Sequence, residues 1–425
     1  MEPYLKITAF SPAWIRDFKC SGQDCPLTCC RGWNIPVDEA HAAFYSQVTD
    51  PDLAPRLQIS LKEIRTKRNR QYQNHYFLNL LDQPEEICAL QDSEGLCRIQ
   101  KEFGAAALPD TCYFFPKVLW QINNGWTLSA DFACPEVLRA AILSPEPATF
   151  QWIETERDPQ AEWLETTLIQ DQPVRALLTN RQAIVLAVIR IIQDRRFETA
   201  DRVYRACRFL SALTMENLPE DADKAVSQIE QAASATINSA ADEEKIKPFV
   251  SSEKAAVWVR QLDKIFNWGM ESNGKFNREM QHDFLQLLCG RTDPFMKIAE
   301  NYLLARDHIF LPYISANPHL IENFFVHFVF SDMLKQFSAY QTGYLTVDEI
   351  LGYEISQLCA VFALFHFLMA GQTLTAGHMN RQSFLQTIYH AGQSYLHYPA
   401  FIRQCVRRLP PGLSREEDIR LLLSC

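Results

Sequence analysis

Cysteine is the residue type whose spacing in this sequence most clearly suggests chemistry. Four cysteines fall within eleven residues near the N-terminus, and eight of the thirteen lie in the first 134 residues. The eight are Cys20, Cys25, Cys29, Cys30, Cys88, Cys97, Cys112 and Cys134. Thiols at this density, in a chain without a recognisable export signal, are more typical of metal ligands than of disulfides or packing groups. We therefore predict a thiolate-bound metal centre built from these residues.

The spacing of the thiols favours an iron–sulfur cluster. The first group reads C-x4-C-x3-C-C, which contains neither the C-x2-C pairs of zinc ribbons nor the C-x3-C-x2-C triplet of radical enzymes. Proline follows both Cys25 and Cys134, as it does in ferredoxin-like sites. Only two of the ten histidines, His41 and His75, lie in this region, which disfavours a mixed zinc site. Zinc and a metal-free role stay open as alternatives.

The side chains of neighbouring residues on an extended backbone point in different directions, so the thiols of the adjacent Cys29 and Cys30 are expected to point apart. We expect one of the two to bind a given cluster, while the other packs or binds a second metal. The remaining five cysteines are dispersed, mostly on apolar helical faces, and we interpret them as small buried hydrophobes. They are Cys207, Cys289, Cys359, Cys405 and Cys425.

Composition limits the class of protein. The 425 residues include 41 basic and 51 acidic side chains, a net charge of −10, without the basic surface of a nucleic-acid-binding protein. The N-terminus lacks a basic segment followed by an apolar one, so we expect no signal peptide and a cytoplasmic location. One basic run, residues 62–70, is interpreted as a solvated helix face, with docking on an acidic partner or peripheral association with an anionic membrane as the alternative. A homo-oligomer stays open.

The texture of the sequence changes near residue 150. Residues 1–150 are irregular, with predicted helices at 37–47 and 57–81 and a hairpin at 120–130 that turns at Asn124-Gly125. Helical periodicity dominates residues 151–425. We predict helices at 160–178, 181–196, 199–216, 221–240, 252–267, 277–289, 293–305, 318–340, 347–370, 380–395 and 415–424. The predicted fold is mainly α, with a cysteine-rich metal-binding domain (1–150) packed on an all-α domain for scaffold, substrate and cofactor (151–425).

Three details of the helical half can be checked directly. Asn180 is predicted to cap the helix that follows it, and Gly371 to end the helix 347–370. The most apolar stretch, residues 358–370, is too short to span a bilayer, and we interpret it as part of a buried helix.

The cysteine-rich half resembles the flagellin lysine-N-methylase family. The matching features are Tyr4, Phe18-x-Cys20 leading into CPLTCCRGW, Cys88-Ala-Leu, Gly95-Leu-Cys97-Arg-Ile and Leu108-Pro-Asp-Thr-Cys112-Tyr-Phe-Phe-Pro116. The same layout is similar to a wider group of cysteine-rich zinc- or iron-chelating domain proteins. The resemblance is specific over residues 1–140, and over the helical remainder it rests on length and texture.

The resemblance implies a methyl transfer from S-adenosylmethionine to lysine ε-amines of flagellin. It also implies an oxygen-sensitive [4Fe–4S] cluster whose ligands come from the eight cysteines, without saying which four. No G-x-G occurs in the chain, so a dinucleotide-type cofactor fold is not expected. A cluster with an open iron could bind the cofactor instead. Asp38, Glu39 or Asp131 could accept the amine proton, and nearby aromatic residues could dry the metal site or face the sulfonium cation.

Two other functions fit the residues. One is an iron- or zinc-binding module for metal storage, delivery or redox sensing, which would have no affinity for S-adenosylmethionine. The other is a helical interaction protein in which the metal only stabilises the N-terminal half.

Overall fold

The computed structural model describes residues 4–25, 27–31, 34–63, 76–79, 87–122, 125–157, 163–164, 171–213, 222–239, 245–270, 294–335, 346–392 and 416–425. The chain forms two compact units. The N-terminal unit holds Met1–Leu119, Trp126–Val137 and Gln151–Ala161, and the helical unit holds Trp120–Gly125, Leu138–Phe150 and Glu162–Cys425. The predicted functional division at residue 150 stays a prediction.

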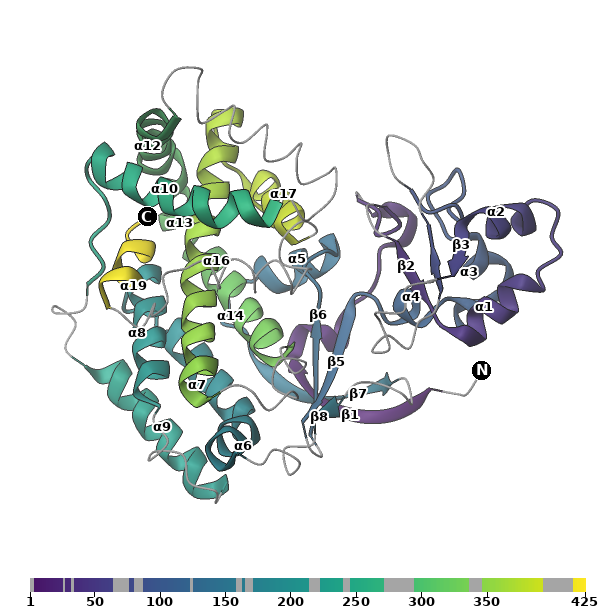
Figure 1. Cartoon of the computed structure of the whole chain (residues 1–425), viewed down its shortest axis with the longest axis horizontal. Helices are drawn as coiled ribbons and strands as arrows, with labels where there is room; N and C mark the ends of the chain where they lie inside the picture. Colours follow the sequence, from purple (N-terminus) through teal and green to yellow (C-terminus); the bar gives the residue numbers. More distant parts are fainter. Residues whose placement is uncertain are drawn as a thin grey trace. The chain divides into compact units, whose positions relative to one another are not determined.

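A small antiparallel sheet supports the N-terminal unit. Its strands β2 (Ile35–Val37), β4 (Tyr76–Leu78) and β3 (Leu61–Glu63) lie in that order, with Leu78 opposite both Ile35 and Leu61. Helices α1 (Glu39–Ser46) and α2 (Leu53–Ser60) lie beside the sheet (Figure 1). Two short helices, α3 (Arg98–Phe103) and α4 (Asp110–Phe114), complete this part.

The core of this part is built from the residues between the cysteines. One cluster of buried side chains joins the small sheet, α1 and α2 to the cysteine segments. It includes Leu90, Ile99 and Leu108, which are 1%, 0% and 8% exposed. These are the apolar residues of the Cys88, Cys97 and Cys112 motifs. The motifs therefore specify a hydrophobic core as well as thiols.

A second sheet contains five strands in the order β7-β1-β6-β5-β8. The strands are β1 (Leu5–Pro12), β5 (Lys117–Ile122), β6 (Gly125–Ala130), β7 (Phe150–Arg157) and β8 (Trp163–Leu164). Strand β1 pairs in parallel with β6, Phe10 opposite Thr127, and β5 pairs in parallel with β8. Helix α5 (Pro135–Ile142) follows β6 in the chain. The predicted hairpin is confirmed in that β5 and β6 are sheet neighbours; Asn124 of its turn lies outside the described residues.

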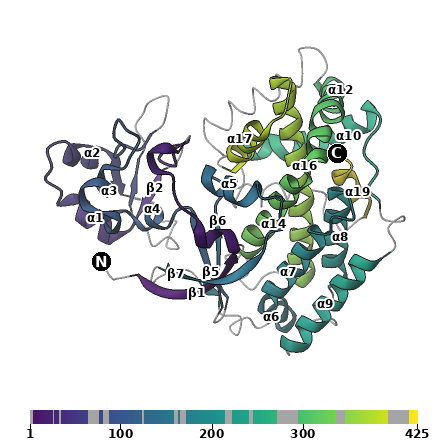
Figure 2. The same cartoon turned by 180° about the vertical axis from the view of Figure 1, so that it is seen from behind.

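The helical unit is arranged around one long helix, α16 (Val347–Ala376). Its neighbours include α8 (Thr199–Ala212), α12 (Pro294–Ala305), α17 (Arg381–Ala391) and α19 (Glu416–Leu423) (Figures 1 and 2). Of the described helices, only this one has a stretch, Val347–Leu374, long and apolar enough to cross a membrane, and the stretch is buried within the protein. The prediction that residues 358–370 belong to a buried helix is confirmed.

Further helices surround this centre. They are α6 (Gln172–Thr179), α7 (Arg181–Ile192), α9 (Ala222–Asn238), α10 (Ser252–Met270), a π-helical turn (Arg306–Phe310), α13 (Leu311–Ala316) and α14 (Pro318–Lys335). Figure 2 shows α7 beside α9, and these two helices are in contact. The prediction of a mainly α fold is confirmed, but the prediction that residues 151–425 are all helical is wrong, because most of β7 and all of β8 lie there and pair in the five-stranded sheet.

Several local predictions are wrong. The helix predicted at 57–81 ends at Ser60, and Leu61–Glu63 and Tyr76–Leu78 form β3 and β4. Within the helix predicted at 160–178, Trp163–Leu164 form β8 and α6 begins at Gln172. Asn180 does occupy the N-cap position of α7, as predicted, but its side chain makes no capping bond there and instead donates its amide to Ala176 O of α6 at 2.9 Å. Gly371 lies inside α16, which ends instead at Gly377 with a left-handed φ of 68°. The predicted helix 277–289 lies outside the described residues.

Candidate metal centre

All eight predicted ligands belong to the N-terminal unit and are free thiols. Cys88 and Cys134 are buried, Cys20 and Cys29 are exposed, and the others are half-buried. Of the remaining cysteines, Cys207 and Cys359 are buried in the helical unit, as predicted, and the terminal Cys425 is buried as well. Cys289 and Cys405 lie outside the described residues. The eight separate into an inner group and an outer group.

The inner thiol group consists of Cys30, Cys88, Cys97 and Cys112. Backbone pairing between distant segments brings the first two together, since Cys88 N–H donates to Cys30 O at 2.8 Å. The next turn adds Cys97, because Gln91 N–H bonds Cys88 O at 3.1 Å and Gln91 itself pairs with Cys97. Cys112 comes from α4. All four pack on or in the same hydrophobic core.

The inner sulfurs act on one another electrostatically. Burial, and then the charges of Cys30, Cys88 and Cys97, raise the pKa of Cys112 well above its ordinary value. Burial, together with Cys30 and Cys97, raises the pKa of Cys88 to about 12. The four sulfurs thus influence one another in an apolar setting, where ionised thiols are costly without a compensating cation.

Cys30 is the inner thiol most ready to ionise. A hydrogen bond from the Cys29 thiol lowers the pKa of Cys30 to about 7. Burial acts in the opposite direction, and a hydrogen bond from the Thr28 hydroxyl adds to the lowering. The hydrogen bond between Cys29 and Cys30, together with burial, raises the pKa of Cys29. Thr28 is itself held by Gln91, whose amide donates to the Thr28 hydroxyl at 3.0 Å. The CPLTCC segment is therefore tied to the Cys88–Cys97 turn by side chains as well as by backbone.

The outer thiol group consists of Cys20, Cys25, Cys29 and Cys134. Burial, together with the charges of Cys25 and Cys20, raises the pKa of Cys134 to about 11. Hydrogen bonds from the backbone N–H groups of Val137 and Glu136 act in the opposite direction and lower it. Cys29 is influenced by Cys134 as well as by Cys30 and Cys112. It lies at the border between the two groups.

The spacing of the sulfurs bears on the metal. Among the described residues, no three cysteine sulfurs lie within 4.8 Å of one another. Tetrahedral zinc, with Zn–S bonds of about 2.3 Å, would bring its thiolates to roughly 3.8 Å. An iron–sulfur cluster holds its ligands further apart, because the irons and sulfides stand between them. Four soft donors in or beside a hydrophobic core, without the close grouping that zinc needs, fit a cluster.

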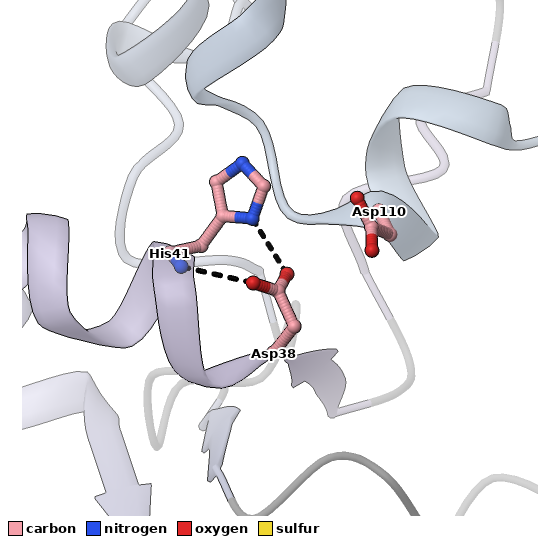
Figure 3. A group of neighbouring side chains, drawn as sticks. All are labelled: Asp38, His41 and Asp110. Atoms are coloured by element: carbon pink, nitrogen blue, oxygen red, sulfur yellow. Dashed lines mark hydrogen bonds and ion pairs between the residues drawn. The ribbon is translucent and has the colours of Figure 1, made fainter. Parts of the chain in front are cut away.

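A different group of side chains has its possible metal-ligand atoms within 4.8 Å of one another. Asp38, His41 and Asp110 place ligand atoms within 4.8 Å of one another (Figure 3). His41 Nδ1 bonds the Asp38 carboxylate at 2.6 Å, and its Nε2 lies 3.3 Å from Ala106 O. Tyr4 donates to Asp110 at 2.8 Å. Because these bonds occupy both ring nitrogens, the group is explained as the cap of α1 joined to the loop before α4.

The same geometry decides how well the predicted proton acceptors could act. Burial opposes ionisation of Asp38, but the side-chain and backbone hydrogen bonds from His41 lower its pKa to about 2. Such a carboxylate is a weak base for a lysine amine. Asp131 is buried and accepts Ala133 N–H at 2.9 Å, whereas Glu39 is exposed on α1. None of the three is positioned for catalysis by a contact described for it.

Aromatic residues adjoin the inner group on one side. Tyr113 packs against the core that holds the inner thiols, and its ring centroid lies 4.3 Å from that of Tyr4 and 5.0 Å from that of Phe114. Trp126 is covered by Arg157, whose guanidinium carbon is 5.0 Å from the ring centroid. The prediction of an apolar cover over the thiols fits Tyr113. The sulfonium contact stays a prediction.

Comparison with known proteins identifies the family. Residues 186–410, just over half of the chain, match the model of the FliB lysine N-methylase C-terminal domain. This chain belongs to the FliB lysine N-methylase family. The FliB match lies in the helical half, where resemblance by motif was weakest. The prediction of the family from the cysteine motifs is confirmed.

Three curated FliB relatives share about the same identity with this chain. The flagellar biosynthetic protein FliU of Salmonella muenchen is 33% identical over 141 residues, which are 33% of this chain and 80% of that protein. The lysine-N-methylases of Salmonella choleraesuis and Salmonella typhimurium are 33% identical over 141 residues, 33% of this chain and 34% of each relative. The match thus covers about a third of the length of these two relatives. No solved structure matches.

Sequence reasoning missed the division of the thiols and the contact between α1 and Asp110. Both depend on pairing between distant segments, such as Arg31 opposite Ile87. The sequence did contain one indication of the division, because the adjacent Cys29 and Cys30 were not expected to bind the same cluster.

Proposed function

We propose that the protein is an S-adenosylmethionine-dependent protein-lysine N-methyltransferase that acts on flagellin and requires a cysteine-ligated [4Fe–4S] cluster. The observation that carries the proposal is the match of residues 186–410 to the FliB lysine N-methylase C-terminal domain. The names of the relatives, a flagellar biosynthetic protein and two lysine-N-methylases, support the substrate and the reaction. We place the reaction in the cytoplasm, where thiols stay reduced.

The inner thiol group is our choice for the cluster ligands. Cys30, Cys88, Cys97 and Cys112 supply four soft donors at the edge of a hydrophobic core, which suits a cluster sensitive to oxygen and water. When bound, such a cluster supplies one-electron chemistry or, where an iron lacks a thiolate, a position for the amine and carboxylate of S-adenosylmethionine.

The residues of the chain itself then have two tasks. They must exclude water around the thiols, which the core residues Leu90, Ile99 and Leu108 do by their burial. They must also hold the neutral lysine amine close to the methyl group, because positioning supplies much of the rate in a transfer of this kind. The low pKa of Asp38 makes it a poor proton acceptor, so we assign the proton to no residue of the chain.

The test is methyl transfer by the full chain, purified without oxygen and reconstituted with iron and sulfide. Flagellin and S-adenosylmethionine carrying a labelled methyl group are added, and modified lysines are identified by mass spectrometry. Cys97→Ala should lower the rate at least tenfold together with the iron content. Cys207→Ala, a buried thiol of the helical unit, is the matched control and should keep both.

The alternative outcomes separate the components of the proposal. Full activity in a protein that holds no iron would remove the cluster from the function. Stoichiometric iron or zinc without binding of S-adenosylmethionine, measured by equilibrium dialysis, would select the metal-binding module instead.

A further inference from the structure

One metal centre does not use all eight thiols of the N-terminal unit. A [4Fe–4S] cluster takes four protein ligands, as does a structural zinc ion, and the inner group supplies four alone. We propose that the outer thiol group, Cys20, Cys25, Cys29 and Cys134, holds a second thiophilic metal centre, separate from the first. The proposal rests on the proposed function only in taking the inner group as the first centre.

The two loops that carry the outer thiols are fixed to each other. Ser21, next to Cys20, donates its hydroxyl to Glu136 at 3.2 Å, and Glu136 is two residues beyond Cys134. Each loop is also closed internally, because Cys25 N–H bonds Gly22 O and Cys134 N–H bonds Asp131 O, both at 3.1 Å. The Ser21–Glu136 bond thus joins the loop of Cys20 and Cys25 to the loop of Cys134 without using a thiol, while the Cys25 thiol donates to Leu27 O at 2.5 Å.

Backbone amides are directed at two of the outer sulfurs. Gly22 N–H lies 3.4 Å from Cys20 Sγ. Cys134 directly precedes α5, and the first amides of that helix act on its sulfur. N–H groups aimed at sulfur stabilise the thiolate, which is the form that binds metal.

The adjacent pair Cys29 and Cys30 separates the two centres. Cys30 packs against the hydrophobic core with the other inner thiols, whereas Cys29 does not belong to that core and is exposed. Because its thiol is exposed and lies outside that core, we assign Cys29 to the outer group.

The chemistry of the ligand follows from the donors and their exposure. Four thiolates select soft metals. Because no three cysteine sulfurs among the described residues lie within 4.8 Å of one another, the outer thiols, like the inner ones, fit an iron–sulfur cluster rather than a single zinc ion. Two of the outer thiols are exposed, so this centre is open to solvent and to small ligands, unlike the inner one. Metal uptake replaces each S–H bond by a sulfur–metal bond and releases the thiol proton.

The test counts metal and does not depend on methyl transfer. The full chain is purified without oxygen, reconstituted with iron and sulfide, and analysed for iron, sulfide and zinc per chain. Two clusters predict about eight irons per chain and no zinc. The outer double variant Cys20→Ser/Cys134→Ser should lose the second metal alone, while Cys97→Ser/Cys112→Ser should lose the first alone.

Three results would overturn the second centre. The first is about four irons and no zinc in the unsubstituted chain, and the second is metal content unchanged in the outer variant. The third is loss of the same single cluster, judged by electron paramagnetic resonance, from both double variants. Cys20→Ser alone gives a check that does not disturb the fold, because Cys20 is exposed. Failure of the methylation assay with two metal centres present would reject the proposed function and keep this inference.

Discussion

At the scale of single residues, the Asp38–His41 pair links a helix cap to a charge. Asp38 accepts the His41 backbone N–H at 2.9 Å and the ring Nδ1 at 2.6 Å. His41 is 2% exposed, yet the hydrogen bond to Asp38 and its charge outweigh burial, so the pKa of His41 is raised. At pH values below the raised pKa of His41, the pair is an ionic contact, and little water reaches the His41 ring.

The first prediction concerns the pH dependence of this pair. The pKa of Asp38 is lowered to about 2, so its contribution to stability is complete above about pH 4 and is lost as the pH falls towards 2. The pKa of His41 is raised above 6.5, so its contribution is complete below pH 6.5 and is lost as the pH rises through the folded value. Asp38→Asn should thus destabilise the N-terminal unit most between about pH 4 and 6.5.

The measurement is urea unfolding of the original chain and of Asp38→Asn at pH 5.5 and 8.5. Asparagine caps helices as well as aspartate does, so this variant isolates the charge, while Asp38→Ala removes the cap as well and should cost about 1 kcal/mol more. A difference between the original chain and Asp38→Asn that is the same at both pH values would contradict the charged pair.

His366 is the opposite case, a buried histidine held neutral. It lies in α16 among Phe310, Phe362 and Phe365, with both ring nitrogens buried and without a hydrogen-bond partner. Burial, and then the charge of Arg306, lower its pKa to about 3. Between about pH 6.5 and 3, His366 is therefore protonated in the unfolded chain but stays neutral in the folded chain. The free energy of unfolding falls as the pH drops through this range, by up to about 1.4 kcal/mol per pH unit.

The second prediction is that His366→Leu stabilises the protein by roughly 1 kcal/mol near neutral pH, because it removes an unsatisfied buried polar group. The variant should also lose part of its acid sensitivity. Thermal unfolding at pH 7.5 and 4.5 checks both, and His308→Gln, an exposed histidine of the neighbouring π-helical turn, serves as control. A variant less stable than the original at both pH values would show that the ring nitrogens are satisfied in solution.

At the scale of elements, three parts of the helical unit meet at one carboxylate. Glu322 of α14 is 0% exposed and bonds Arg195 Nε at 2.8 Å and Arg202 Nη1 at 2.9 Å. Arg202 belongs to α8, and Arg195 lies in the link between α7 and α8. The carboxylate has two cationic partners, and each guanidinium also bonds a backbone carbonyl, Pro145 O for Arg195 and Phe197 O for Arg202.

The third prediction follows from this burial. Glu322→Gln should destabilise the helical unit by about 3–5 kcal/mol, because it leaves buried positive charge without compensation. Glu300→Gln is the matched control, since its ion pair with Lys297 is about half exposed on both sides and should be worth less than about 1 kcal/mol. Equal effects of the two substitutions in chemical denaturation would mean that Glu322 is solvated.

Helices and strands could be predicted from the sequence where local periodicity determines them, but not where contacts with distant segments do. Residues 181–192 form α7 as predicted, because their apolar residues recur with the helical period. Residues 61–63 were predicted as helix but form β3, since pairing with the distant β4 outweighs local preference. Helix α16 runs past Gly371 because it is buried on all sides, so the end of its apolar stretch at residue 370 does not mark the end of the helix.

The candidate site shows the same limit. Residue type and density alone predicted the eight thiols as metal ligands, and that role stays a prediction. Their division into two groups could not be predicted, because it depends on long-range contacts such as Cys88 with Cys30 and Ser21 with Glu136. Spacing along the chain contains no information about such contacts.

At the scale of the whole molecule, the two units are stabilised by different means. The inner thiols belong to the core cluster of the N-terminal unit. Among the described residues of the helical unit, the core consists of apolar and aromatic side chains around α16, together with buried ion pairs such as Arg181 with Glu354. No predicted metal ligand lies in that part of the described chain. Metal should therefore stabilise one unit and leave the other unchanged.

The fourth prediction tests this separation by hydrogen exchange of the full chain, with metal bound and after anaerobic removal of metal by a chelator. Exchange should accelerate at least tenfold, equivalent to about 1.4 kcal/mol, in the segments 27–31 and 87–112, because binding free energy that contributes to folding is lost there. Exchange in α7 and α16 should stay the same. Adding iron and sulfide back should restore the slow exchange, which distinguishes metal loss from irreversible damage. Equal acceleration in both units would mean that the metal stabilises the molecule as one cooperative whole, and no acceleration in either would mean that the thiols do not bind metal.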